Sequence, residues 1–154
     1  MLLSKRTKDR IDAKIRELTP RNKGNSLDWI IRQLNQYLIG WIGFFGICTS
    51  GVTSTLGSLD AHIRRRLRAI LLKHWKRKLT QVRKLIYLGA RRQTAWRTVY
   101  GGRKSIWALS HTPVVDRTLR NAYFAKRGLV SLLDRWREKS GSIAAPAQLK
   151  LSLG

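Results

Sequence analysis

Apolar residues recur at helical spacing along most of the chain, and no stretch alternates apolar and polar residues as a strand would. The clearest pattern predicts a long helix that begins at Gly57 or Ser58 and ends near Lys78. One face of this helix is expected to be buried, including a core histidine: Leu59, Ile63, Leu67, Ile70, Leu71 and His74. The pattern as a whole predicts an all-α protein, a helical bundle followed by shorter helices.

Two helices are predicted before this one. The first covers residues 4–18, with Ser4 as its N-cap and Pro20 just beyond its end. The second covers residues 26–45 and places Asp28 in its first turn. Its apolar positions are expected to be core: Leu27, Ile30, Ile31, Leu34, Leu38, Trp41, Ile42 and Phe45.

Glycine, serine and threonine dominate residues 46–57, which we expect to form a loop. Thr112 and Pro113 are typical of a helix start, and Gly128 is expected to end that helix. Val115, Leu119, Ala122 and Tyr123 would form its apolar face. The short helices after residue 78 are expected at residues 81–88, 91–100, 113–128 and 131–139, before a loose tail at 140–154.

The net charge of the chain indicates what kind of partner it binds. The formal net charge is +24, and the 55 residues between Asp60 and Asp116 contain 15 Lys and Arg but no Asp or Glu. The positive electrostatic field of such a chain attracts a polyanion, and nucleic acid is the obvious polyanion. We expect the side of the long helix opposite its apolar stripe to form one cationic face, made by Arg64, Arg65, Arg66, Arg68, Lys73 and Lys76.

Leu72 and Trp75 fall within this cationic arc, and two interpretations are open. Both side chains could contact a second layer of the protein. Alternatively, Trp75 could pack on a ribose or base beside the phosphate contacts of Arg64 and Arg68.

No catalytic residues, metal or cofactor are expected. The eight Asp and Glu include no adjacent pair, so a two-metal centre is not indicated. No Cys-x-x-Cys occurs, and His62 is expected to be a surface or RNA contact rather than a general base. Residues 101–104, GGRK, lack a phosphate-loop pattern and read as a flexible turn.

The single cysteine, Cys48, is expected to be a small buried hydrophobe in a reducing compartment. No export signal is visible, which favours the bacterial cytoplasm or an organelle. Residues 37–52 are apolar but short for a spanning helix, so we expect no membrane partner. A basic membrane-associated protein that uses this stretch is the alternative.

Residues 34–45 read LNQYLIGWIGFF, and residues 59–68 read LDAHIRRRLR. These segments resemble the LNxYLxGWxxYF and LDxWIRRRLR signatures of the maturase-specific region of group II intron proteins. Residues 73–77, KHWKR, resemble the KxWKR that follows. Further similarity lies at residues 15–19, 107–110, 119–124 and 128–136, so the resemblance covers about residues 5–137.

The resemblance implies the thumb, or domain X, of an intron-encoded reverse transcriptase, followed by a DNA-binding segment. It implies a connector at 1–25, the thumb at 26–79, the basic helical segment at 80–139 and a tail at 140–154. A thumb of this kind grips intron RNA and the template–primer duplex, and assists splicing and mobility. The Tyr-x-Asp-Asp box of the palm is not in the sequence, so we expect no reverse transcription by this chain alone.

The resemblance also implies site residues. The RNA-binding set is Arg64, Arg65, Arg66, Arg68, Lys73, Trp75, Lys76, Arg77 and Lys78. A second set, for DNA or RNA, is Arg83, Lys84, Arg91, Arg92, Arg103 and Lys104. The alternatives to an RNA-binding module are the thumb subunit of a split reverse transcriptase, with Leu72, Trp75 or residues 37–45 docking a separate palm chain, and a truncated remnant without function.

Overall fold

Local sequence determines where the first two helices begin. In the computed structural model, α1 covers Lys5–Leu18, and the Ser4 hydroxyl accepts a hydrogen bond from an amide of the first turn. α2 covers Leu27–Phe45 and begins in the same way, because the Ser26 hydroxyl accepts from a first-turn amide. Both helices confirm the predicted caps and bounds.

The structure describes residues 4–21, 24–45, 52–102 and 104–138, and within these ranges it contains helices and no strand. The fold is therefore all-α, as predicted. Cys48 and the tail at 140–154 lie outside the described residues. The helices after α2 are α3 (Val52–His74), α4 (Lys78–Tyr87), α5 (Arg92–Tyr100), α6 (Ile106–Leu109), α7 (Pro113–Thr118), α8 (Asn121–Lys126) and a last helical segment at 132–138.

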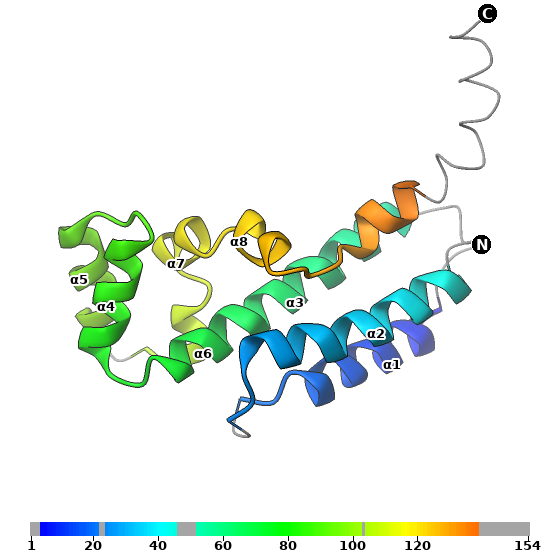
Figure 1. Ribbon diagram of the computed structural model, residues 1–154, viewed down its shortest axis with the longest axis horizontal. Coiled ribbons are helices and arrows are strands. Elements are labelled where there is room, and N and C mark those ends of the chain that lie inside the picture. Colours follow the sequence, from blue (N-terminus) through cyan, green and yellow to red (C-terminus); the bar gives the residue numbers. More distant parts are fainter. Residues whose placement is uncertain (1–3, 22–23, 46–51, 103, 139–154) are drawn as a thin grey trace, which may run out of the picture.

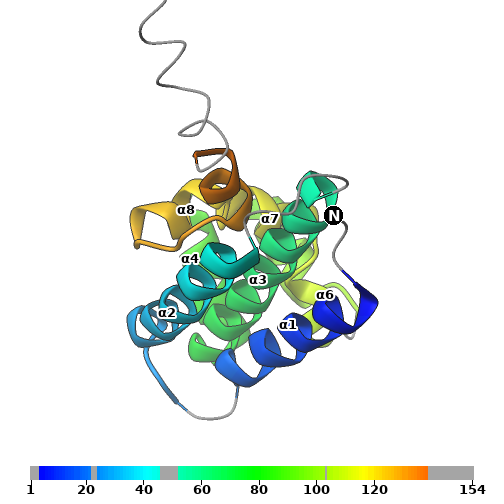
Figure 2. The ribbon, with the colours of Figure 1, turned by 90° about the vertical axis from the view of Figure 1, so that its right-hand side faces the viewer.

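α3 is the long axis around which the other elements are arranged (Figure 1). α1 and α2 run beside it, and the end-on view shows these three helices side by side (Figure 2). α4 and α5 form a hairpin at the C-terminal end of α3, and α7 contacts both of them. One continuous cluster of buried apolar side chains runs from α1 to the 132–138 segment.

α3 begins earlier than its sequence predicts. Residues 52–57 are helical rather than a loop, and Val52 and Leu56 are buried on the same stripe as Leu59. Burial of this stripe outweighs the low helix propensity of the intervening Thr, Ser and Gly residues. The rest of the predicted loop, 46–51, lies outside the described residues.

α3 also ends earlier, at His74 instead of Lys78. Lys76 adopts a left-handed backbone with φ of 56°, which turns the chain into α4. The Gln81 side chain donates a hydrogen bond to the Leu72 carbonyl, 3.0 Å away, and so satisfies one carbonyl of the last turn of α3. His74 is exposed at this helix end, so its prediction as a core histidine is wrong.

The single helix predicted at 113–128 is two helices, α7 and α8. The Thr118 hydroxyl donates to the carbonyls of the preceding turn, and the Leu119 carbonyl accepts a hydrogen bond from a side chain of α3. These bonds end α7 before Arg120. Leu119 and Val115 are buried as predicted, but Ala122 is exposed because α8 starts in a new direction.

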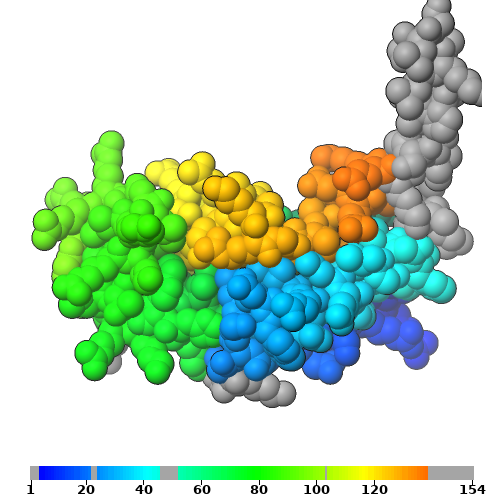
Figure 3. Space-filling view, viewed as in Figure 1, coloured from blue at the N-terminus to red at the C-terminus, as the bar shows by residue number. Residues whose placement is uncertain are grey.

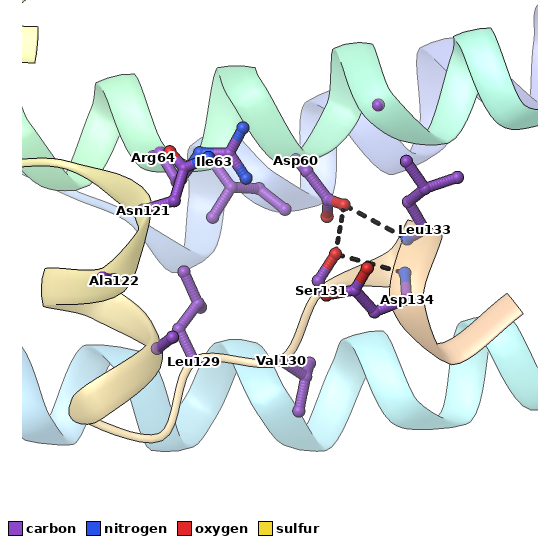
Figure 4. A pocket seen from close by; sticks show the side chains of 12 residues that line it. Asp60, Ile63, Arg64, Asn121, Ala122, Leu129, Val130, Ser131, Leu133 and Asp134 are labelled. Carbon is purple, nitrogen blue, oxygen red and sulfur yellow. Dashed lines mark hydrogen bonds between the residues drawn. The ribbon is translucent and has the colours of Figure 1, made fainter. Parts of the chain in front are cut away.

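Two polar side chains hold residues 128–138, the C-terminal strap, against the bundle. The Asp60 carboxylate on α3 accepts hydrogen bonds from the Ser131 hydroxyl at 2.8 Å and from the Leu132 and Leu133 amides at 2.9 and 3.1 Å. Figure 4 shows the bonds from Ser131 and Leu133. It thereby caps the 132–138 helix from outside it. Asn35 on α2 donates to the Gly128 carbonyl and accepts from the Val130 amide.

We expect Asp60→Ala to lower the free energy of unfolding by about 2 kcal/mol, because it removes three hydrogen bonds from a buried carboxylate. Urea denaturation followed by circular dichroism would measure the change. Asp134→Ala is the matched control: its carboxylate is exposed, and the substitution should change the stability by less than about 0.5 kcal/mol. Equal unfolding midpoints for the two variants would contradict this role of Asp60.

Candidate nucleic-acid interface

Arg65 points into the protein rather than away from it. Its Nη2 donates to the Trp107 carbonyl at 3.0 Å, and its guanidinium carbon lies 3.9 Å from the centroid of the Trp107 ring. Stacking and main-chain bonding together attach α6 to α3. Arg65 is half-buried and serves the fold.

Arg66 makes an equivalent attachment to the end of α1. Its Nε donates to the Thr19 hydroxyl at 2.5 Å and its Nη2 to the Thr19 carbonyl at 3.0 Å. Burial lowers the pKa of the Arg66 guanidinium, and the positive charges of Arg21 and Arg16 lower it further. Arg66 therefore connects the C-terminal end of α1 to α3.

Arg68 is the most deeply placed of these residues, with only 6% of its surface exposed. Its Nε donates to the Leu119 carbonyl at 2.7 Å, and its Nη1 lies 3.0 Å from a carboxylate oxygen of Asp116. Burial lowers the pKa of the Arg68 guanidinium, while the charge of Asp116 raises it and that of Arg64 lowers it. This group ties α7 to α3.

The expectation of a single cationic face on α3 is therefore wrong. Arg68 is buried and bound to the protein itself, and Arg65 and Arg66 use their donors on main-chain carbonyls. Arg64 is half-exposed at the rims of two hollows, and no hydrogen bond or ion pair to its guanidinium occurs within the described part of the chain. The reason is geometric: α1, α6 and α7 surround α3, so its polar side faces other helices.

The hollows beside Arg64 are small. The first, of about 280 Å³, lies between α3, α8 and the C-terminal strap (Figure 4), where Figure 3 shows a notch in the surface. Its walls are mainly apolar side chains and the capped Asp60. The second, of about 520 Å³, includes the Arg68–Asp116 pair.

Exposed cations gather instead on the α4–α5 hairpin and the turn before it, which form one end of the molecule (Figure 3). We call this set the cationic hairpin surface. It comprises Lys76, Arg77, Lys78, Arg83, Lys84, Arg91, Arg92 and Arg97. All but Arg97 belong to the predicted site residues, and their role as nucleic-acid contacts stays a prediction.

The remaining predicted residues are placed differently. Lys73 is exposed near the end of α3, and Trp75 is half-buried against the core, which favours the interpretation that it contacts the protein. Leu72 is fully buried, which confirms the same interpretation for it. Lys104 is exposed and donates to the Thr98 carbonyl, and Arg103 lies outside the described residues.

Sequence reasoning did not single out a second group of arginines. Arg117 of α7 and Arg120 before α8 line a hollow of about 490 Å³ together with Arg91. No hydrogen bond or ion pair to these three guanidinium groups occurs among the described residues, and no carboxylate lines the hollow. The periodicity of α7 could have indicated Arg117, but the turn at Leu119 that brings Arg120 beside it is a tertiary feature.

Residue types that bind metals do not cluster in the described part of the chain. No group of three or more His, Cys, Asp or Glu that could hold a metal occurs in the described ranges. His62 is half-buried, its Nε2 is shielded without a hydrogen-bond partner, and its ring meets Trp107 edge-on. Burial lowers the pKa of His62. His62 lines two surface hollows, and its role as a surface or RNA contact stays a prediction. No helix in the described segments is both long and apolar enough to cross a membrane.

The architecture defines a basic, all-helical domain that attaches its own helices through buried and half-buried arginines and exposes a cluster of cations on the α4–α5 hairpin. Residues 8–87, more than half of the chain, match the family described as the group II intron, maturase-specific domain. The chain therefore belongs to that family, as its motifs indicated. The matched residues run from α1 to the end of α4. A comparison with curated proteins finds no match for this chain.

Arg68→Gln should lower the free energy of unfolding by about 2 kcal/mol, because it leaves the Leu119 carbonyl without its buried donor. Thermal or urea unfolding would show this. Arg64→Gln removes the same charge four residues earlier on α3 and should change the stability by less than about 0.5 kcal/mol. If Arg64→Gln were the more destabilising substitution, the assignment of Arg68 to the interior would be wrong.

Proposed function

We propose that this chain is an RNA-binding module of a group II intron maturase, which grips intron RNA to assist splicing and mobility and makes or breaks no bond itself. Family membership supports the identity of the RNA. The observation that carries the proposal is the cationic hairpin surface, because it concentrates exposed Lys and Arg at one end of the molecule, on a chain segment without Asp or Glu.

The hairpin suits phosphate recognition because its cations stand on a rigid base. Val82 and Leu85 of α4 and Ala95 and Val99 of α5 are buried, so the backbones that carry the exposed side chains are fixed by packing. Fixed cations favour one spacing of phosphates. The module therefore recognises the shape of folded RNA through its backbone more than its base edges.

The three-arginine hollow extends this surface toward α7. Arg91, at the start of α5, is both a member of the cationic hairpin surface and one wall of the hollow, facing Arg117 and Arg120. Three guanidinium groups without a carboxylate repel one another, and a phosphate between them relieves that repulsion. An RNA backbone that follows the cationic hairpin surface would pass this hollow.

A variant that replaces Lys76, Arg77, Arg83 and Lys84 by Gln should bind folded group II intron RNA with a weaker salt dependence. Each lost phosphate contact reduces the magnitude of the slope of log K against log salt by about 0.7 to 0.9, so four should reduce it by about 3. Filter binding or fluorescence anisotropy at several salt concentrations would measure the slope. All four side chains are exposed, so circular dichroism should show unchanged helicity.

The matched control replaces four exposed cations of α1, namely Lys5, Arg6, Arg10 and Arg16, by Gln. It removes the same number of positive charges from α1, which lies away from the α4–α5 hairpin (Figure 1). Its slope should stay close to that of the unmodified protein. Equal losses of slope in the two variants would indicate diffuse attraction and contradict a binding surface on the hairpin.

A second candidate function is favoured by the outer face of α2. Trp29, Ile39 and Phe44 are exposed there, an apolar surface of the kind that partner chains cover. The chain would then supply the thumb to a separate reverse-transcriptase palm, and template–primer duplex would join intron RNA as a ligand. Co-purification with such a palm, lost on Phe44→Asp but kept on substitution of the hairpin cations, would support this function.

A further inference from the structure

α5 places two large aromatic side chains on the surface of a strongly basic hairpin. Its buried residues, Ala95 and Val99, face α4 and α7. One residue after each, Trp96 is 37% exposed and Tyr100 is 44% exposed. Neither belongs to the hydrophobic core or to the side chains packed against it. More than a third of the surface of each of these two residues therefore stays open to solvent.

The two rings form a stack of their own. Their centroids are 5.0 Å apart and their planes differ by 16°, so each ring covers one face of the other. Lys78 lies beyond Tyr100, with its Nζ 5.7 Å from the Tyr100 centroid. Among the described residues, no ring or cation lies over the other face of the Trp96 indole. The Trp96 end of the stack is the open end.

Cations also lie along the face of α5 that carries this stack. Residues four apart on a helix are neighbours on one face, so Arg92, Trp96 and Tyr100 follow one another along α5. Lys78 joins them because α4 and α5 pair side by side. The order along the face is therefore cation, indole, phenol, cation, and the whole segment from residue 61 to 115 contains no carboxylate.

We propose that the Trp96–Tyr100 face is a stacking site for an unpaired base of single-stranded nucleic acid. The base extends the stack on the open face of Trp96, and Arg92 and Lys78 receive the phosphates on either side of it. This proposal rests on the proposed function and deepens it, because it adds recognition of an unstacked nucleotide to the grip on folded RNA.

Charge decides between nucleic acid and protein as the occupant. A protein segment that covered two aromatic rings would have to carry its own carboxylates to approach Arg92 and Lys78. A nucleotide brings a flat ring and an adjacent phosphate in one ligand, which matches the order of groups on α5. Bases within a duplex are already stacked on their neighbours, so the site selects single strands.

The test compares a single-stranded RNA of about 12 nucleotides with a duplex of the same sequence, using the full chain. Trp96→Ala should weaken single-strand binding about 5- to 100-fold and change duplex binding less than about twofold. Trp96→Phe should recover most of the affinity. The salt slope should not change in either variant, because no charge is removed.

Tyr87→Ala is the matched control. Tyr87 is 86% exposed on α4 and has no aromatic partner among the described residues, so its removal should leave both affinities unchanged. Tryptophan fluorescence supplies a second readout: single strands should quench the unmodified protein more than Trp96→Phe. Circular dichroism would verify that each variant keeps its helices.

The outcomes separate this inference from the proposed function. Salt-dependent binding of the unmodified protein with no loss in Trp96→Ala would overturn the stacking site and leave the RNA-binding module intact. Equal losses for single strand and duplex would also overturn it. Absence of salt-dependent binding to either RNA would overturn both proposals. Self-association that Trp96→Ala abolishes, at unchanged RNA affinity, would assign the face to a second copy of the chain.

Discussion

Scarcity of carboxylates is the constraint on which this structure depends. The chain has 32 Lys and Arg but 8 Asp and Glu, so ion pairs such as that of Arg68 with Asp116 can serve only a minority of its cations. Three guanidinium groups of α3 instead donate hydrogen bonds to main-chain carbonyls: Arg65 to Trp107, Arg66 to Thr19 and Arg68 to Leu119. A carbonyl accepts such bonds without requiring a second buried charge, and each one fixes a different helix to α3.

Arginine therefore has two roles in this protein, and the role depends on where in the sequence the residue lies. Arginines in the middle of α3 are surrounded by other helices and define the fold. Those on α4, α5, α7 and their connections face solvent, and the three that line the hollow beside α5 have no counter-charge there. The interior arginines hold helices in place on α3, so the exposed cations have fixed positions on the surface. Recognition of a folded nucleic acid by its shape requires such fixed positions.

The sequence predicted most of the local structure, because caps and periodicity act locally. Ser4 begins α1 and Ser26 begins α2 as expected, and Gly101 follows the end of α5. The errors arose where distant segments meet. Val52 is helical because its stripe is buried, and the break at Leu119 depends on a donor from α3.

The sequence predicts which basic residues are available for the candidate site, but not which way their side chains point. The basic run between Asp60 and Asp116 is plain in the sequence, and it contains the hairpin cations that the structure exposes. A helical wheel placed Arg68 on the outside because it cannot include α7, which covers that side. Trp96 and Tyr100 stand four residues apart, a pattern visible in advance, but their stacking and the approach of Lys78 follow from the pairing of α4 with α5.

The attachment of the C-terminal strap has a consequence for biosynthesis. Asn35 finds its partners 93 and 95 positions later, and Asp60 finds its own 71 to 73 positions later. When α2 and α3 emerge from the ribosome, both polar side chains are still hydrogen-bonded to water. The strap can bind them only after Leu133 has itself left the exit tunnel, so this part of the native state forms last.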